Sequence, residues 1–279
     1  MESPARLSLR HALALGLLQG PTELLPVSSS GHTTLIPWLA GWPYAELDPE
    51  LRKSFEVALH AGAGVALAID MRTELLEAVL RLNRRRAGVI ALSVGLPALA
   101  GYALERPIER RLGGPRSIAA GLIAGAVAMA VADISPGRGT RQEDEAGPRD
   151  GLALGLAQAV ALIPGVSRNG ATLTAARACG FRRKDAQTLS WHAALGVILG
   201  ASALKAWRMW QRGVPDEAWP ALAVGAGSAF VSTTASARLL RRPSVGARGL
   251  LPYAVYRCTI AAIVLEKSKR LRRTQNRDR

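Results

Sequence analysis

The segment PTELLPVSSSGH, residues 21–32, places several polar side chains inside one of the most apolar parts of the chain. It brings together the carboxylate of Glu23, three consecutive serine hydroxyls, a glycine and the imidazole of His32. Polar groups among leucines cost free energy unless they are hydrogen-bonded or bind something. A carboxylate, a hydroxyl and an imidazole can act as base, nucleophile and proton carrier. The segment is therefore the first candidate for a reactive site.

Local spacing predicts two helices here with a break between them. Gln19 and Glu23 are four residues apart, so they lie on the same side of a helix. Pro26 ends that helix because the residue before a proline disfavours helical geometry. Serines ahead of a new helix offer hydroxyls and backbone N–H groups, which together form an anion site. Simple helix capping explains the same three serines, Ser28, Ser29 and Ser30.

A second polar break occurs in PGVSRNGAT, residues 164–172. Pro164 and Gly165 interrupt the apolar run, and Arg168 stands where the next helix is expected to begin. An arginine at membrane depth is costly unless it is paired, and its planar guanidinium suits phosphate oxygens. Three neutral donors surround it, namely Ser167, Asn169 and Thr172.

The two breaks belong to related stretches of sequence. At a shift of 139 residues, ALGLLQ (14–19) returns as ALGLAQ (153–158), and PVSSSGHT (26–33) returns within PGVSRNGAT. At a shift of 132, HAGAGVAL (60–67) returns as HAALGVIL (192–199), which pairs His60 with His192. Both histidines fall within apolar runs, and we interpret them as packing or inter-helix hydrogen-bonding residues. The chain is predicted to be a duplication.

The elements that must position these groups follow from hydropathy. Long runs rich in Ala, Leu, Val and Gly alternate with short arginine-rich segments, a pattern typical of membrane spans joined by basic loops. Glycines within the runs are interpreted as sites of close helix packing. Six runs are near the minimum length for crossing the hydrocarbon core, namely 54–70, 87–104, 117–133, 187–206, 219–237 and 249–265.

The sequence thus predicts an all-α polytopic membrane protein with an inverted repeat, about six transmembrane helices and two re-entrant helix–loop–helix hairpins at 8–40 and 151–178. Each repeat, about 8–133 and 151–265, holds one hairpin and three spans within a single integral membrane domain. Because three is odd, the second copy is inverted, and the hairpins enter from opposite faces and meet near the midplane. A basic tail, 266–279, follows.

Lysine and arginine counts favour one orientation. By the positive-inside rule one set of loops is cytoplasmic, and the first hairpin then opens outward. The cytoplasmic set is 71–86, 134–150, 180–186 and 239–248, and the opposing set is 41–53, 105–116 and 208–218. The seven Lys/Arg residues of the tail oppose this assignment under a six-span count.

Composition excludes several other classes. The net charge of +15 comes from arginines between apolar runs, and aromatic residues are only 5%, which argues against a nucleic-acid platform and for anionic lipid. Cys179 and Cys258 form neither a disulfide framework nor a zinc motif. Glu2 and Pro4 precede the first apolar run, and we expect no cleaved signal peptide.

If the hairpins meet, their polar groups form one site suited to phosphoryl transfer. Arg168 and two helix N-termini would bind phosphate, and His32 would attack phosphorus or carry a proton. Glu23 would orient His32, activate water or hold a divalent cation. SSSGH lacks the strand–turn–helix setting of an acyl-transfer nucleophile. A structural Glu23–Arg168 ion pair and a purely structural His32 are the alternatives.

These motifs resemble those of the bacterial undecaprenyl-pyrophosphate phosphatase family, also called bacitracin-resistance proteins. GPTELLPVSSSGH with the upstream Gln19 is similar to the family's Glu/Gln-x-x-x-Glu motif and the Pro-Val-Ser-Ser-x-Gly-His segment after it. PGVSRNGAT is similar to the family's Pro-Gly-x-Ser-Arg-Ser-Gly-x-Thr motif. The resemblance extends over nearly the whole chain.

The resemblance implies a multi-pass enzyme of the bacterial plasma membrane. It would remove the terminal phosphate from undecaprenyl (polyprenyl) diphosphate and return the monophosphate carrier to cell-wall synthesis. A divalent cation, Mg²⁺ or Ca²⁺, is implied, with Glu23 as its ligand, and a homodimer is possible. The implied catalytic residues are Glu23, Ser29, His32 and Arg168. The implied substrate-binding residues are Gln19, Ser28, Ser30, Ser167, Asn169 and Thr172.

Three departures from the family pattern leave alternatives open. Gln19 takes the neutral option at the first acidic position, Asn169 stands in place of a usual serine, and residues 174–196 match loosely. The attacking group stays open among His32, Ser29 and water. A lipid-carrier transporter or flippase with the same inverted repeat, or a non-catalytic homologue, is the alternative function.

Overall fold

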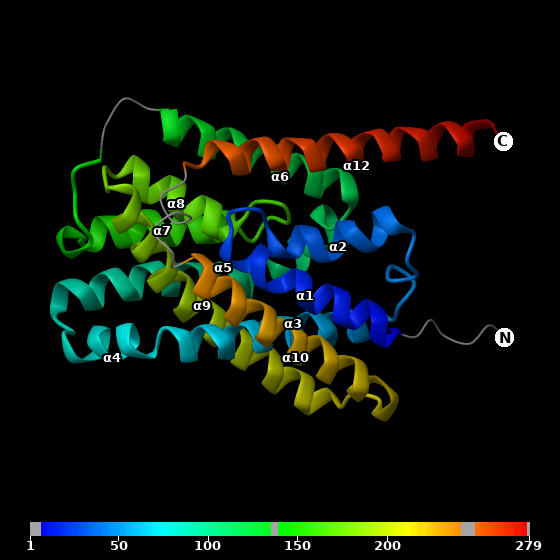
Figure 1. The fold of residues 1–279 in the computed structure, drawn as a ribbon, viewed down its shortest axis with the longest axis horizontal. Helices are drawn as coiled ribbons and strands as arrows, with labels where there is room; N and C mark the ends of the chain where they lie inside the picture. Colours follow the sequence, from blue (N-terminus) through cyan, green and yellow to red (C-terminus); the bar gives the residue numbers. More distant parts are fainter. Residues whose placement is uncertain (1–6, 135–138, 241–248, 278–279) are drawn as a thin grey trace.

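The computed structural model describes residues 7–134, 139–240 and 249–277, and helices dominate all three stretches (Figure 1). The β structure in these stretches is a single bridge between Arg141 and Phe181. The all-α class predicted from the sequence is therefore confirmed. The eleven α-helices described are α1 (Leu9–Leu24), α2 (Ser29–Ala40), α3 (Pro49–Asp70), α4 (Arg72–Leu80), α5 (Arg84–Leu112), α6 (Pro115–Ile134), α7 (Pro148–Val160), α8 (Arg168–Ala178), α9 (Arg183–Arg212), α10 (Trp219–Leu240) and α12 (Leu251–Arg277).

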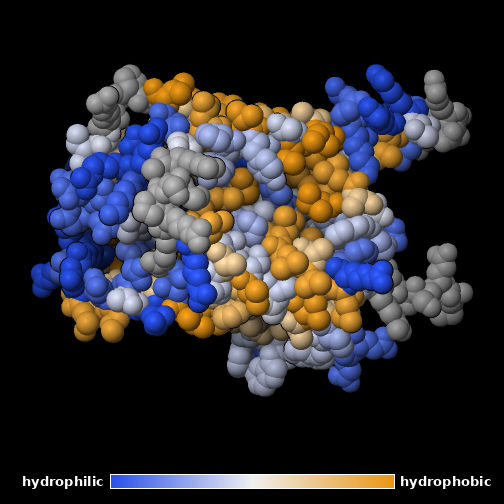
Figure 2. All heavy atoms as spheres, viewed as in Figure 1, coloured by the Kyte–Doolittle hydropathy of each residue, from blue (hydrophilic) through white to orange (hydrophobic). Residues whose placement is uncertain are grey.

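Every predicted span falls within a helix or overlaps one, in the order α3, α5, α6, α9, α10 and α12. Three of these helices, α5, α6 and α9, are long and apolar enough to cross a membrane. Helices α3 and α4 would together form a fourth span, bent by 67° at their junction. Apolar side chains spread over the middle of the molecule and hydrophilic ones gather toward its ends (Figure 2). These features are those of a multi-pass membrane protein.

One predicted loop and the C-terminal tail are helical in the structure. Residues 71–86 were expected to be a loop, but α4 occupies much of this segment because RTELLEAVL consists mainly of strong helix formers. The basic tail continues α12 as helix to Arg277 and projects beyond the neighbouring helices (Figure 1). Residues 135–138 and 241–248, in two of the loops counted for orientation, lie outside the described residues, as do residues 1–6.

Both polar breaks separate two helices, as predicted. The first hairpin is α1 and α2 with a short break at 25–28, and the second is α7 and α8 with a longer break at 161–167. Their second helices begin alike. Ser28 and Ser167 are the N-caps, and their hydroxyl oxygens accept from the N–H groups of Gly31 (3.3 Å) and Gly170 (3.2 Å).

The entry to the second hairpin is fixed by an ion pair. Arg141 donates to both carboxylate oxygens of Asp150, each at 2.8 Å, and to the carbonyl of Cys179 at 2.8 Å. Burial acts to raise the pKa of Asp150, but the bonds from Arg141 and from the Gly147 N–H outweigh it and lower the pKa. The carboxylate is therefore held charged at the start of α7.

The helices pack in corresponding pairs. Helix α1 packs along α10 and α7 along α5, while α3 packs against α9 and α6 against α12. Glycines permit the closest approaches. A Cβ at Gly16 would lie 2.6 Å from the Gly225 carbonyl oxygen, and one at Gly155 would lie 2.2 Å from that of Leu92. Gly16 and Gly155 are equivalent at the 139-residue shift, so both hairpins use the same close packing of their first helix.

Candidate active site

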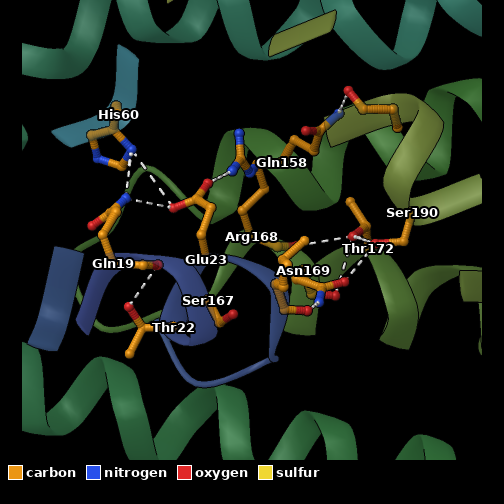
Figure 3. Close-up of polar contacts among 12 residues, drawn as sticks. Gln19, Thr22, Glu23, His60, Gln158, Ser167, Arg168, Asn169, Thr172 and Ser190 are labelled. Carbon is orange, nitrogen blue, oxygen red and sulfur yellow. Dashed lines mark hydrogen bonds and ion pairs between the residues drawn. The ribbon is translucent and has the colours of Figure 1, made fainter. Parts of the chain in front are cut away.

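The two hairpins meet through side chains from the ends of their breaks. Arg168, the first residue of α8, donates to Oε1 of Glu23 near the end of α1 (Figure 3). The adjacent Asn169 donates through Nδ2 to the carbonyl of Leu24. The Glu23 side chain is 1% exposed, whereas Arg168 keeps 22% of its side chain accessible. A carboxylate with almost no access to water is therefore neutralised by an arginine that still reaches open space.

The other oxygen of Glu23 contacts two further side chains. The amide nitrogen of Gln19 lies 3.1 Å from Oε2 of Glu23 and 3.1 Å from Nδ1 of His60. His60 Nδ1 is itself 3.6 Å from the same carboxylate oxygen (Figure 3). Gln19 is wholly buried, and its Oε1 has no hydrogen-bond partner among the described residues. Helix α3 thus adds a histidine to the pair supplied by α1.

The serine loop follows Glu23 through an unusual backbone conformation. Ser28 has φ 78° and ψ 93°, and it is the only non-glycine residue with positive φ in the described part of the chain. Such strain persists only where the surrounding structure enforces it, and it is common at functional sites. Ser29 follows as the first residue of α2 and lines the same cavity as Glu23. The strained turn is therefore followed directly by a serine in the cavity that also holds the carboxylate.

His32 does not join this group. Its Nδ1 lies 2.8 Å from the Ser28 carbonyl oxygen and its Nε2 2.8 Å from the Tyr256 hydroxyl on α12. A carbonyl only accepts, so Nδ1 carries the hydrogen and Nε2 accepts from Tyr256. The ring is 1% exposed. Both ring nitrogens of His32 thus have hydrogen-bond partners other than Glu23 and Arg168, and its part in the site stays a prediction.

Thr172 also lies away from open space. It is wholly buried, and its hydroxyl lies 2.5 Å from that of Ser190 on α9. Ser190 donates at 2.8 Å to Oδ1 of Asn169, whose amide nitrogen reaches the first hairpin (Figure 3). Thr172 therefore supports Asn169, and the substitution of the family's usual serine by Asn169 provides a direct bond between the hairpins.

A cavity of about 1000 Å³ opens in front of the Glu23–Arg168 pair. Charged side chains of both signs line it, including Arg52, Lys53, Arg106, Glu105 and Glu109, and apolar side chains form part of the remaining wall. Gln19, His32 and Thr172 are not among its described lining residues. Those predicted site residues that do line it are Glu23, Ser28, Ser29, Ser30, Ser167, Arg168 and Asn169.

The arrangement can bind an anion and act on it. Two helix N-termini, at Ser29 and Arg168, reach the same cavity, and a helix N-terminus attracts negative charge. Arg168 adds a bidentate donor suited to phosphate. Ser29 is an accessible hydroxyl beside a carboxylate that can take its proton. The described residues include no cluster of three or more His, Cys, Asp or Glu side chains that could hold a metal ion by themselves.

Sequence reasoning singled out His60 but neither Ser190 nor Tyr256. His60 was interpreted as a packing or inter-helix hydrogen-bonding residue, and its contact with Gln19 joins α3 to α1 in that way. Its place in the cavity lining beside Glu23 was not predicted. The signal that could have identified it is a polar side chain within an apolar span, which is costly unless it is used. The others act through a neighbour, and no local motif marks them.

Known proteins with similar sequences extend these observations. A protein family described as "Bacitracin resistance protein BacA" matches residues 12–263. An undecaprenyl-diphosphatase of Geobacter metallireducens is 38% identical over 267 residues, which cover 91% of this chain and 96% of that protein. One of Geobacter sulfurreducens is 38% identical over 272 residues, with 93% and 98% coverage. One of Thermomicrobium roseum is 34% identical, with 91% and 96% coverage.

Proposed function

The chain belongs to the bacitracin resistance protein BacA family, and we infer from this membership and from its site that it is an undecaprenyl-diphosphatase. It hydrolyses undecaprenyl diphosphate to the monophosphate and inorganic phosphate, which returns the lipid carrier to cell-wall synthesis. The observation that carries the inference is the Glu23–Arg168 contact between the two hairpins at the head of a large cavity.

We propose that the terminal phosphate takes the place of Glu23 on Arg168. The guanidinium and the N-termini of α2 and α8 would bind its oxygens, where they counter the charge that develops during transfer. The isoprenyl chain would leave along the apolar wall of the cavity toward lipid. The tight burial of Glu23 and the partial exposure of Arg168 support this exchange, because only the arginine is free to follow an incoming anion.

Ser29 is the attacking group that the geometry favours. Its Oγ–H proton passes to Glu23 while an Oγ–P bond forms and the P–O bond to the lipid monophosphate breaks. Glu23 releases this proton to bulk water before the second step. Water then attacks the phosphoserine and gives a proton to Glu23 while the Oγ–P bond breaks, and Glu23 passes that proton to Ser29 Oγ as inorganic phosphate is released. The position of Ser29 and Glu23 in the lining of one cavity supports this role, whereas the burial of His32 argues against direct attack by the imidazole.

We propose that a divalent cation binds beside Glu23. Glu23 Oε2 and His60 Nδ1 lie 3.6 Å apart, and both lie 3.1 Å from the amide nitrogen of Gln19. That nitrogen is a hydrogen-bond donor, so the Gln19 amide would have to turn its oxygen toward the ion. The buried Oε1 of Gln19, which lacks a partner, is an acceptor that such an ion could use. A bound ion, Mg²⁺ or Ca²⁺, would neutralise phosphate charge.

We further propose an inverted repeat within the bacterial plasma membrane, with six spans and two re-entrant hairpins. Under this arrangement α1, α2, α3, α5 and α6 correspond to α7, α8, α9, α10 and α12. The pairing of α1 with α10 then matches that of α7 with α5, and α3–α9 and α6–α12 are pairs of equivalent helices. This correspondence of contacts supports the proposal. A homodimer stays a prediction.

The test is release of inorganic phosphate by the purified protein in detergent. Undecaprenyl diphosphate and the shorter farnesyl diphosphate serve as substrates, each with and without a chelator. We expect release that depends on the cation. Movement of the lipid across liposomes without phosphate release would indicate a transporter instead, and neither activity would indicate a non-catalytic homologue.

A further inference from the structure

Arg257, on α12, is the largest of the side chains that are completely buried in the described structure. Its guanidinium donates to four backbone carbonyl oxygens. Two belong to α6, those of Gly121 (3.3 Å) and Leu122 (3.2 Å). The other two belong to the hairpin breaks, those of Pro26 (3.2 Å) in the first and Gly165 (2.7 Å) in the second. One side chain therefore holds both breaks.

The burial of Arg257 costs free energy. Burying a charge costs free energy unless it is fully paired, and Arg257 has no carboxylate within ion-pair distance among the described residues. Carbonyl dipoles alone satisfy it. An apolar residue would pack between helices at a lower cost in free energy. We therefore attribute the presence of the guanidinium to its hydrogen bonds with the two breaks.

The preceding residue of α12 acts on the first hairpin from the same side. The Tyr256 hydroxyl donates to His32 Nε2 at 2.8 Å, and the two rings are stacked with centroids 5.7 Å apart. His32 in turn donates to the carbonyl of the strained Ser28. Arg257 thus contacts the two breaks that directly precede Ser29 and Arg168, and Tyr256 contacts the helix that Ser29 begins.

We propose that Tyr256 and Arg257 form a bracket that fixes the distance between Ser29 and Arg168 across the cavity. Arg257 is a positioning residue that acts on both hairpins, and Tyr256 acts on the first alone. The proposal rests on the proposed function for its kinetic consequence, because displacement of either hairpin separates the attacking hydroxyl from the phosphate-binding arginine. The bracket itself is a property of the structure and can be tested separately.

The first test removes the guanidinium. We expect R257Q to lower kcat about 100-fold, the loss typical of a misplacement near 1 Å, with little change in KM because the lipid contacts remain. R257K, whose ammonium can bond to fewer carbonyls, should have a kcat between those of R257Q and the wild type. Arg116 is the matched control. It also joins α6 to α12, through a 3.1 Å bond to the Ser268 carbonyl, and this described hydrogen bond involves neither hairpin.

The second test moves the guanidinium without removing it. A Cβ at Gly125 would lie 2.2 Å from Nη2 of Arg257, the flexible end of that side chain, so G125A pushes the guanidinium off its carbonyls while the fold can adapt. G227A is the control, because nothing lies within 4 Å of a Cβ at Gly227. We expect G125A to reduce kcat and G227A to leave it unchanged. This variant decides the matter if R257Q does not fold.

Hydrogen exchange gives a readout that does not need activity. R257Q and G125A should accelerate amide exchange in both breaks, 25–28 and 161–167, whereas R116Q should not. If the wild type released no phosphate, the proposed function would fail and this exchange pattern would still test the bracket. Folded R257Q and G125A with wild-type exchange in the breaks, or R116Q with losses equal to those of R257Q, would overturn the proposal.

Discussion

The two hairpins begin their second helices with the same capping bond and then differ in the type of the next residue. Ser28 and Ser167 cap α2 and α8 through the same bond to a glycine N–H three residues on. The first helical residue is Ser29 in one hairpin and Arg168 in the other. Equivalent positions on a common scaffold therefore supply the candidate nucleophile and the phosphate-binding cation.

The first helices of the two hairpins, α1 and α7, also differ in their polar contacts. Gln19 and Gln158 are equivalent in the repeat, and each is buried with its Oε1 unpartnered among the described residues. Gln19 contacts the site residues Glu23 and His60, whereas Gln158 donates to backbone carbonyls of Ser93 (2.7 Å) and Ala193 (3.5 Å). The position equivalent to Glu23 is Leu162. Under the proposed function, the first hairpin carries the candidate reactive groups and the second carries the candidate phosphate-binding arginine.

The largest effect should come from the two divergent positions themselves. We expect S29A to reduce phosphate release about 10³-fold or more, because it removes the nucleophile. R168K retains the charge but loses the planar fork, and should cost about 10²-fold. Both are measured as kcat/KM in detergent, with S54A as a control serine on the cavity wall. Near-normal S29A would assign the attack to water.

A smaller effect should separate the equivalent glutamines. Q19A removes the bonds that orient Glu23 and His60, so it should lower kcat about 10–100-fold with little loss of stability. Q158A removes bonds to the backbone of α5 and α9, so it should lower the unfolding temperature and leave the activity of the folded protein near normal. Kinetics and thermal unfolding of both variants in one detergent check this. If Q19A and Q158A lowered kcat equally, the two hairpins would not have different roles in the reaction.

The equivalent histidines should differ in their response to cation. H60A removes a nitrogen beside Glu23 Oε2, and we expect an apparent affinity for the activating divalent ion about tenfold lower. H192A, at the repeat-related position outside the cavity lining, should leave that affinity unchanged. Direct titration of Mn²⁺ by electron paramagnetic resonance measures binding apart from turnover. If H60A bound Mn²⁺ with unchanged affinity, the ion site would not be the group formed by Gln19, Glu23 and His60.

Sequence patterns predicted the parts of this molecule that depend on local or repeated features. Hydropathy located the helices, and the similarity of the two breaks in sequence led to the prediction that Glu23 and Arg168 would meet, as they do. Helix α4 was missed because a charged, helix-forming segment between apolar runs was counted as loop. The side of the serine loop on which His32 lies was not predictable, since spacing along a chain does not specify which neighbour an imidazole will face. Tyr256 and Arg257 contact breaks more than 90 residues away in sequence, and no local pattern encodes that.

The smallest effect concerns the backbone difference between the two caps. Ser28 has φ 78°, where an L-residue is strained, whereas Ser167 has φ −48°. Glycine at an N-cap costs only a few tenths of a kcal/mol relative to serine, and strain of this kind is about 1–3 kcal/mol. We therefore expect S28G to raise the free energy of unfolding by about 1 kcal/mol and S167G to lower it by about 0.5–1 kcal/mol. Measurement of the unfolding free energy of both variants in one detergent shows whether each substitution stabilises or destabilises the protein.

If S28G destabilised the protein as much as S167G does, the conformation of Ser28 would not store strain, and the two caps would differ in geometry alone. If S28G is more stable but slower, the strained turn is what holds the Ser29 hydroxyl against Glu23, and the first hairpin gives up stability to keep its nucleophile in place.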